Sequence, residues 1–201
     1  MRVIIALKLM DSIPQIEGDY IGCDKGAVIL ANNNIHMIAS IGDFDSIHVD
    51  DSKKIEQYSD EVIYLNPIKN DSDSEAAVKY AIQKGYDEII LYGAFGGRAD
   101  HTYYNIRLAY QYPNLLKLMD SNNLVYCLKE GSYTIPKDKY RYISFFTDTE
   151  SMITLEGFEY TLNHRIITKE DLYTLSNKIM DKQATLIIEK GSVLVLQTKD
   201  A

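Results

Sequence analysis

Residues 88–101 read EIILYGAFGGRADH, and this stretch is the clearest guide to the fold. Glu88–Tyr92 has the apolar, β-branched character of a buried strand. A loop with three glycines follows, and then a helix is expected from about His101 to Gln111, closed by Pro113. A buried strand, a glycine-rich loop and a helix in this order predict a parallel sheet with helices on its faces.

The rest of the first half repeats this alternation of strand and helix. The clearest helix is Ser74–Lys84, because Ser72–Glu75 has the form of a capping box and Gly85 is a typical stop signal. Together these elements predict an α/β domain with a mostly parallel sheet over residues 1–122. The other predicted strands are Val3–Leu7, Tyr20–Cys23, Met37–Ile41 and Glu61–Leu65.

After about Asn122 the pattern changes to short strands separated by turn signals such as Glu130-Gly131-Ser132. Only Lys169–Lys182 is a candidate for a helix. The pattern is typical of a small antiparallel sandwich or barrel, and we predict a β-sandwich over residues 123–201. The predicted strands are Leu124–Leu128, Tyr133–Ile135, Tyr140–Phe146, Met152–Leu155, Phe158–Leu162, Ala184–Glu189 and Val193–Gln197.

Charge and composition exclude several classes of protein. With 21 Lys and Arg against 29 Asp and Glu, the formal charge is −8, which argues against binding to nucleic acid. No segment has the ~18 apolar residues of a membrane span, and the apolar run at Val3–Leu7 is too short for a signal peptide. Cys23 and Cys127 are far apart and in no metal-binding spacing, which favours a reducing compartment. We therefore expect a cytoplasmic protein.

Acidic residues follow the predicted strands repeatedly. In open α/β sheets the ligand lies beyond the carboxyl ends of the strands, so these side chains are expected at one edge. Six carboxylates packed together would repel one another, and a bound divalent cation would remove that conflict. Ligation by oxygen alone favours Mg²⁺ over zinc. The six residues are Asp24, Asp43, Asp45, Asp71, Asp73 and Asp100.

The glycine-rich loop suits a phosphate group. Gly93, Gly96 and Gly97 allow backbone N–H groups to approach an anion, and a helix N-terminus follows at once. Arg98 adds a planar fork for phosphate oxygens. The loop is neither a Walker A motif nor a Rossmann fingerprint, so a P-loop kinase mechanism is excluded.

Each feature also has a purely structural interpretation. A single aspartate after a strand more often caps a helix than binds a ligand, and Asn70–Ser74 has the form of such a cap. The pair Asp43 and Asp45, and the combination of the glycine-rich loop with Arg98 and Asp100, favour a functional site. His36, His48 and His164 have no neighbouring set of metal ligands and are expected to be structural or exposed.

In their order and spacing, the polar motifs resemble those of the bacterial thiamin pyrophosphokinase family from about residue 20 to the C-terminus. In the second half, Gly157–Leu162 resembles a strand of that family and Ser176-Asn177 resembles its Ser-Asn motif. The first-half motifs that carry the resemblance are Cys23–Gly26, Gly42–Ser46, Asp71–Asp73, Gly93–His101 and Asn105.

The resemblance implies an α/β catalytic domain, a β-sandwich thiamin-binding domain, and a homodimer with active sites at the subunit interface. The implied reaction moves a diphosphate from ATP to thiamin with the help of Mg²⁺. The implied metal ligands are Asp43, Asp45, Asp71, Asp73 and Asp100. The implied catalytic residues are Asp71, Asp73, Asp100 and Arg98, with Asp71 or Asp100 accepting the proton. The implied nucleotide- and thiamin-binding residues are Asp24, Lys25, Gly96, Gly97, Arg98, His101, Ser176 and Asn177.

Three departures from the family pattern accompany this resemblance. Leu7–Met10 stands where the family has a Gly-Gly pair, Lys178 replaces a Glu, and Lys169–Asp171 replaces a Gly-Ser pair. Two alternatives are open. The same acidic edge would suit a metal-dependent hydrolase of nucleotides or diphosphate esters, with water as the nucleophile, and the departures around Ser176-Asn177 would suit an inactive protein that binds thiamin or its diphosphate. The products distinguish the hydrolase from an enzyme that transfers diphosphate, because a hydrolase needs no acceptor alcohol. The intact acidic motifs argue against the inactive binding protein.

Overall fold

The computed structural model describes residues 1–45, 47–66 and 72–200 of the 201-residue chain. The chain forms two compact units, and α4 and β6 contribute to both of them. Within the described residues, no helix has the length and apolar character needed to cross a membrane. The first unit comprises Met1–Leu108 and Lys117–Ser121, and the second comprises Ala109–Leu116 and Asn122–Ala201.

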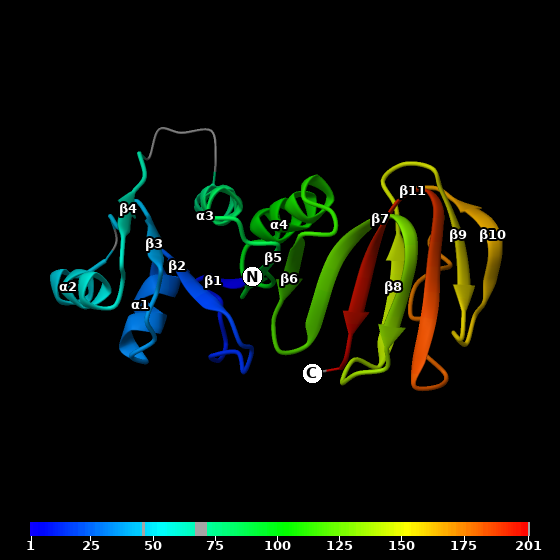
Figure 1. Cartoon of the computed structure of the whole chain (residues 1–201), viewed down its shortest axis with the longest axis horizontal. Coiled ribbons are helices and arrows are strands. Elements are labelled where there is room, and N and C mark those ends of the chain that lie inside the picture. The colour runs from blue at the N-terminus through cyan, green and yellow to red at the C-terminus, as the bar shows by residue number, and fades with distance from the viewer. Residues whose placement is uncertain (46, 67–71, 201) are drawn as a thin grey trace. The chain divides into compact units, whose positions relative to one another are not determined.

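The first unit is a parallel sheet with helices on both faces, and its strand order is β4-β3-β2-β1-β5-β6 (Figure 1). Helices α3 and α4 lie on one face, whereas α1 lies on the other with α2 packed against it. The elements are β1 Arg2–Ala6, β2 Asp19–Cys23, α1 Lys25–Asn32, β3 Ala39–Gly42, α2 Val49–Gln57, β4 Val62–Tyr64, α3 Asp73–Gln83, β5 Glu88–Tyr92, α4 Ala99–Gln111 and β6 Leu116–Met119.

Local sequence explains the central elements of this unit. Val3, Ile4 and Ile5 are fully buried, as expected for a central strand covered on both faces. The Ser72 hydroxyl accepts a hydrogen bond of 3.2 Å from the Glu75 N–H, so the predicted cap of α3 is confirmed. The mostly parallel sheet with covering helices is also confirmed, whereas the strand β6 was not predicted.

The second unit is antiparallel and is organised by two long strands, β7 and β11. The first half of β11 pairs with β9 and with the end of β7, and its second half pairs with β8 and with the start of β7. The long strands therefore pass from one layer to the other, which gives a small antiparallel sandwich. The strands are β7 Asn123–Pro136, β8 Tyr142–Phe146, β9 Ser151–Glu156, β10 Leu162–Ile167 and β11 Gln183–Thr198.

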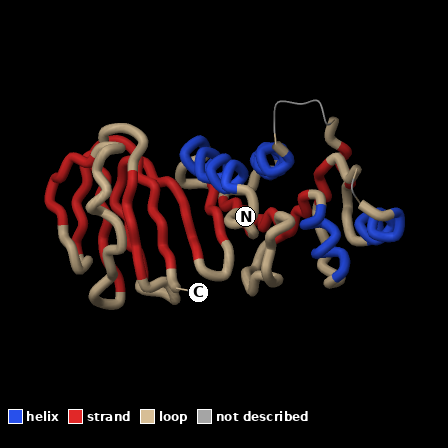
Figure 2. Tube along the Cα trace, turned by 180° about the vertical axis from the view of Figure 1, so that it is seen from behind, coloured by secondary structure: helices blue, strands red, loops and turns tan. Residues whose placement is uncertain are grey.

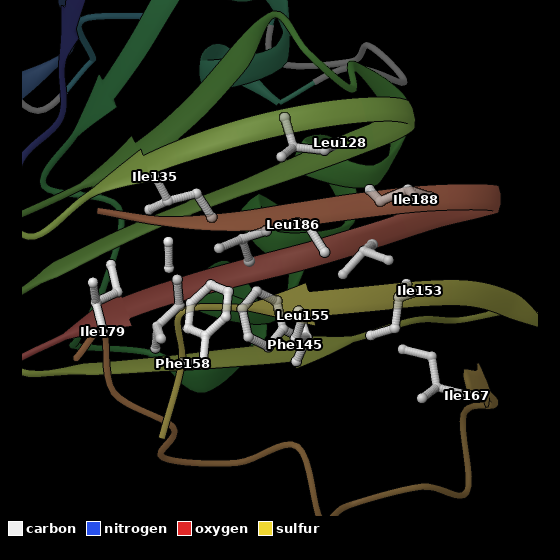
Figure 3. Packing of buried hydrophobic residues seen from close by; sticks show 14 residues of the cluster. Leu128, Ile135, Phe145, Ile153, Leu155, Phe158, Ile167, Ile179, Leu186 and Ile188 are labelled. Carbon is white, nitrogen blue, oxygen red and sulfur yellow. The ribbon is translucent and has the colours of Figure 1, made fainter. Parts of the chain in front are cut away.

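The core of the second unit lies between these layers (Figure 3). Phe145 is fully buried and meets Phe158 edge to face, with ring centroids 5.3 Å apart. Leu186 and Ile188 of β11 belong to the same core, beside their pairing partners Leu155 and Ile153 on β9. Continuous burial of these side chains fixes the register of the strands, because a slip by one residue would turn them to solvent.

Two predicted strand breaks are wrong. The predicted turn at Glu130–Ser132 lies inside β7, and the predicted strands Ala184–Glu189 and Val193–Gln197 are both parts of β11. The register between β11 and β7 shifts after Ile188, and Gly191 adopts a φ of +89° there. The glycines therefore bend paired strands instead of ending them.

Two further predictions in this half are wrong. Residues 169–182 contain no helix, and after α4 the described chain consists of strands, turns and loops (Figure 2). The backbone of this segment bonds to a strand instead of forming helical hydrogen bonds: Asn177 exchanges two backbone hydrogen bonds of 2.8 and 2.9 Å with Ile143 of β8. Phe158–Leu162 is not a strand either, since Phe158 forms only an isolated antiparallel bridge with Ile179 and β10 begins at Leu162.

Candidate active site

A cavity of about 330 Å³ opens at the carboxyl ends of the parallel strands in the first unit. Its position agrees with the rule that open α/β sheets bind ligands beyond these ends. Its walls come from the loops after β1, β2, β3 and β5 and from the starts of α3 and α4. The lining residues are Leu7, Lys8, Leu9, Cys23, Asp24, Asp43, Ser72, Asp73, Ser74, Gly93, Ala94, Gly96, His101 and Asn105.

Asp24 is the most unusual of these residues. It precedes α1 with a φ of +46°, a backbone conformation that costs energy for a residue with a side chain, and its carboxylate does not cap the helix. Its Oδ1 is buried without a hydrogen-bond partner. Burial, followed by the hydrogen bond and charge of Asp73 and then the charge of Asp43, raises the pKa of Asp24 to about 7.

The surrounding backbone is shaped to admit this carboxylate. A Cβ added to Gly42 at the end of β3 would lie 1.9 Å from Oδ1 of Asp24, so a larger residue at position 42 would displace this carboxylate. The Asp24 N–H donates to the Ile41 carbonyl at 3.2 Å and thereby joins the loop after β2 to β3. The glycine of the Gly42–Ser46 motif therefore makes room for a charged side chain from a neighbouring strand.

The loop after β3 presents Asp43 to the cavity. Phe44, with a φ of +53°, meets Tyr64 of β4 edge to face at 5.6 Å and anchors the loop. Oδ1 of Asp43 accepts the Asp45 N–H at 3.3 Å, and the Asp45 side chain is exposed. The loop thus separates its two aspartates, with Asp43 in the cavity wall and Asp45 outside it.

The start of α3 brings Asp73 to the same place. The Ser72 cap fixes the first turn of α3, and the Cys23 thiol lies 3.8 Å from the Asp73 carbonyl. The Tyr104 hydroxyl of α4 donates to the carboxylate of Glu75, which ties the two helices together beside the cavity. The position of Asp73 is therefore set by contacts to both β2 and α4.

The glycine-rich loop after β5 is held by α4. The buried amide of Asn105 donates to the Ala94 carbonyl at 2.9 Å. Outside the cavity wall, Arg98 forms an ion pair with Asp100, and this pairing lowers the pKa of Asp100 to about 2. Both side chains are exposed, so the pair is accessible to a ligand.

The predicted metal ligands are only partly brought together. Asp24, Asp43 and Asp73 line one cavity, whereas Asp45 and Asp100 do not. Within residues 1–45, 47–66 and 72–200, no group of three or more metal-binding side chains is close enough to hold an ion. Asp71 and Ser46 lie outside the described residues. The buried Oδ1 of Asp24 and the like charges beside it nevertheless fit a cation at this point.

The predicted nucleotide-binding residues divide in the same way. Asp24, Gly96 and His101 line the cavity, whereas Lys25, Gly97 and Arg98 do not. Sequence analysis missed Lys8, which lies in the cavity wall after β1. The sequence signal for Lys8 is its position shortly after a central strand, since ligands bind beyond the carboxyl ends of such strands.

In the second unit, the Ser176-Asn177 motif has a clear structural role. The buried amide of Asn177 accepts N–H groups of Tyr160 and Lys178 at 3.0 and 2.9 Å and donates to the Tyr160 carbonyl at 2.7 Å. Ser176 is exposed, has a φ of +59°, and its N–H donates to the Ser144 hydroxyl at 2.9 Å. Asn177 therefore holds two loops together and leaves the Ser176 hydroxyl at the surface.

Comparison with known proteins identifies the family. The model of the thiamin pyrophosphokinase catalytic domain matches residues 17–142, which is more than half of the chain. The model of the vitamin B1 binding domain of thiamin pyrophosphokinase matches residues 132–193. The chain belongs to the thiamin pyrophosphokinase family. The first model covers the cavity except the loop after β1, and the second covers Ser176 and Asn177.

Individual relatives agree with the family models over nearly the whole length. Thiamine pyrophosphokinase of Bacillus subtilis is 34% identical over 187 residues, which cover 90% of this chain and 87% of that protein. The crystal structure of the Bacillus subtilis thiamine pyrophosphokinase matches with a TM-score of 0.88 at 32% identity, covering 100% of this chain and 99% of that chain. The crystal structure of a thiamin pyrophosphokinase family protein from Enterococcus faecalis also matches with a TM-score of 0.88, at 25% identity, covering 100% of this chain and 99% of that chain.

Asp24→Asn is expected to stabilise the metal-free protein. The folded-state pKa of about 7 lies above the ordinary 3.8, so the carboxylate lowers stability progressively as the pH rises between these values. With allowance for partial exposure, the gain is about 1–2 kcal/mol at pH 8 and smaller at pH 4.5. Denaturation in EDTA at both pH values measures it, with Asp45→Asn as the exposed control. A destabilised variant at pH 8 would contradict the account.

Asn177→Ala and Ser176→Ala are expected to differ sharply. Asn177→Ala leaves the partly buried N–H groups of Tyr160 and Lys178 and the Tyr160 carbonyl without partners, which costs about 1–3 kcal/mol of stability. Ser176→Ala removes an exposed hydroxyl and is expected to change the stability by less than about 0.5 kcal/mol. Thermal denaturation of both variants measures the difference, and equal melting temperatures would show that the Asn177 bonds do not stabilise the fold.

Proposed function

We propose that this protein is a thiamin pyrophosphokinase, which transfers a diphosphate from ATP to the hydroxyl of thiamin and releases AMP. The observation that carries the proposal is the acidic cavity at the carboxyl ends of the sheet, in a chain whose two halves match the two domain models of the family. Residues 1–122 would bind and position ATP, and residues 123–201 would bind thiamin.

Mg²⁺ is part of this proposal. The carboxylates of Asp43 and Asp73 would supply ligands beside the unpartnered Oδ1 of Asp24, and the nucleotide would supply the others. Asp45, Asp71 and Asp100 remain candidate ligands from the family resemblance. Bound to phosphate oxygens, the ion would neutralise the negative charge that builds up during transfer. An otherwise unexplained cost of burying Asp24 beside two carboxylates supports a cation here.

The protein's own groups would position the substrates. Backbone N–H groups of the loop around Gly96 and Gly97, at the start of α4, suit the phosphate chain, and His101 lies in the same wall. Asp100 engages Nε and Nη2 of Arg98, so opening of this ion pair would free the whole guanidinium fork for phosphate oxygens. Opening would also release Asp100 as a base, and Asp71 remains the other candidate to accept the thiamin proton.

In-line attack by the thiamin hydroxyl on the β-phosphorus forms the new P–O bond as the bond to the α-phosphate oxygen breaks. The hydroxyl proton passes to the carboxylate base, and AMP leaves with the bonding electrons. Because the reaction needs little covalent participation by the protein, most of the rate gain would come from alignment and charge stabilisation.

Thiamin would bind through the second unit, with the Ser176 hydroxyl as a contact and Asn177 as the residue that positions it. We further propose a homodimer with active sites at the subunit interface. Exposed apolar side chains of the second unit, Leu172, Leu175 and Met180, support an interface there. A cytoplasmic location is also proposed, since Cys23 and Cys127 are both free thiols.

The test is incubation with ATP, Mg²⁺ and thiamin, followed by chromatography of the nucleotides and thiamin species. Equal amounts of AMP and thiamin diphosphate, formed only when all three are present, are expected. Asp73→Asn is expected to lower turnover at saturating Mg²⁺ by about 10²-fold or more. ADP or phosphate formed without thiamin would identify a hydrolase, and thiamin binding without turnover would identify an inactive binding protein; either result refutes the transfer.

A further inference from the structure

The cavity wall contains one residue whose charge is opposite to that of its neighbours. Lys8 is the single lysine or arginine among the described residues that line the cavity. The carboxylates of the same wall are those of Asp24, Asp43 and Asp73. A lone cation among three carboxylates is the group that an incoming anion would meet most favourably.

The loop that carries Lys8 is fixed in place. The Leu7 N–H donates to the Tyr92 carbonyl of β5 at 2.9 Å, and the Met10 N–H closes a turn onto the Leu7 carbonyl at 3.0 Å. Met10 is buried, and a Cβ added to Gly93 would lie 2.5 Å from its backbone nitrogen. The loop after β1 therefore packs directly against the start of the glycine-rich loop, so Lys8 leaves the backbone at a defined point of the wall.

The side chain of Lys8 is available to a ligand. It is exposed to solvent, and no ion pair or hydrogen bond among the described residues involves its ammonium group. Arg98, the other cation near this loop, is paired with Asp100 and lies outside the wall. Of the two, Lys8 can therefore contact an anion in the cavity without first breaking an ion pair.

We propose that the ammonium group of Lys8 binds the phosphate chain of the nucleotide, an inference that rests on the proposed diphosphate transfer. The phosphate chain of ATP carries about four negative charges, and one divalent cation beside three carboxylates does not neutralise them. A lysine supplies a compact positive charge that suits phosphate oxygens. Thiamin, whose thiazolium ring is cationic, would be repelled by the same group, so Lys8 favours the nucleotide over the acceptor.

A purely structural role for Lys8 predicts something different. If the lysine served only to offset the charge of the three aspartates, its loss would lower the stability of the protein without changing the preference for phosphorylated ligands. Binding measurements that compare a nucleotide with its nucleoside separate the two roles, because only the phosphate contact depends on the phosphate chain.

The experiment is calorimetric titration with α,β-methylene-ATP, whose bond at the transfer position is not cleaved, in Mg²⁺ and without thiamin. Lys8→Met is expected to weaken binding about tenfold, the loss of one charge-assisted hydrogen bond. Lys8→Arg keeps the charge and is expected to stay within about threefold of the parent protein. Lys53→Met is the matched control, since Lys53 is an exposed lysine on α2 away from the cavity wall, and it is expected to bind normally.

Adenosine completes the comparison, and its affinity is expected to be the same in all four proteins. The proposal is overturned if Lys8→Met binds α,β-methylene-ATP as tightly as the parent protein, or if it loses affinity for adenosine to the same extent. Failure of the parent protein itself to bind α,β-methylene-ATP would instead overturn the proposed function, together with this inference. The two failures are therefore distinguishable within one titration series.

Discussion

The burial of the Asp24 carboxylate beside Asp43 and Asp73 is the constraint on which the rest of the site depends. The chain accepts a positive φ at Asp24, a buried oxygen without a partner and a raised pKa in the same place. It also keeps Gly42 free of a side chain, because any Cβ there would collide with this carboxylate. Such costs are typical of functional sites, where local stability is given up for a ligand that is bound only in the working protein.

The elements around this cluster hold it rigidly. Phe44 and Tyr64 anchor one loop by an aromatic contact, and the link from Tyr104 to Glu75 joins α3 to α4. The buried amide of Asn105 on α4 holds the glycine-rich loop through its hydrogen bond to the Ala94 carbonyl. A preorganised arrangement of charges avoids the cost of reorganisation when phosphate groups bind, which is the main way in which a protein accelerates phosphoryl transfer.

Sequence predicted the parts of the fold that local signals determine. The strand at Glu88–Tyr92 and the Ser72 cap of α3 were found because burial, turn glycines and capping residues lie within a few positions of each other. The long strands were missed because Gly131 and Gly191 read as turn signals in the sequence. In the structure β7 and β11 stay paired with each other on both sides of these glycines, which therefore bend the strands without ending them. Residues 169–182 are not helical because their backbone bonds to β8, which no local pattern reveals.

The site was predicted to a similar extent and for the same reason. Asp24, Asp43 and Asp73 follow strands or open a helix, so the topology of the sheet was enough to bring them together. Lys8 belongs to no motif, and its only signal in the sequence is its position shortly after a central strand; the packing of its loop against Gly93 then fixes that loop beside the cavity. The exposed positions of Asp45 and Asp100 depend on loop conformations and on the ion pair with Arg98, which spacing alone does not determine.

The most direct test of the central claim is an anomalous-difference map from crystals grown with Mn²⁺ and α,β-methylene-ATP. The account predicts a peak in the cavity of the first unit, bonded to the carboxylates of Asp43 and Asp73. An ordered nucleotide in the cavity, with no metal peak at these carboxylates, would show that the acidic cluster serves some purpose other than holding a cation.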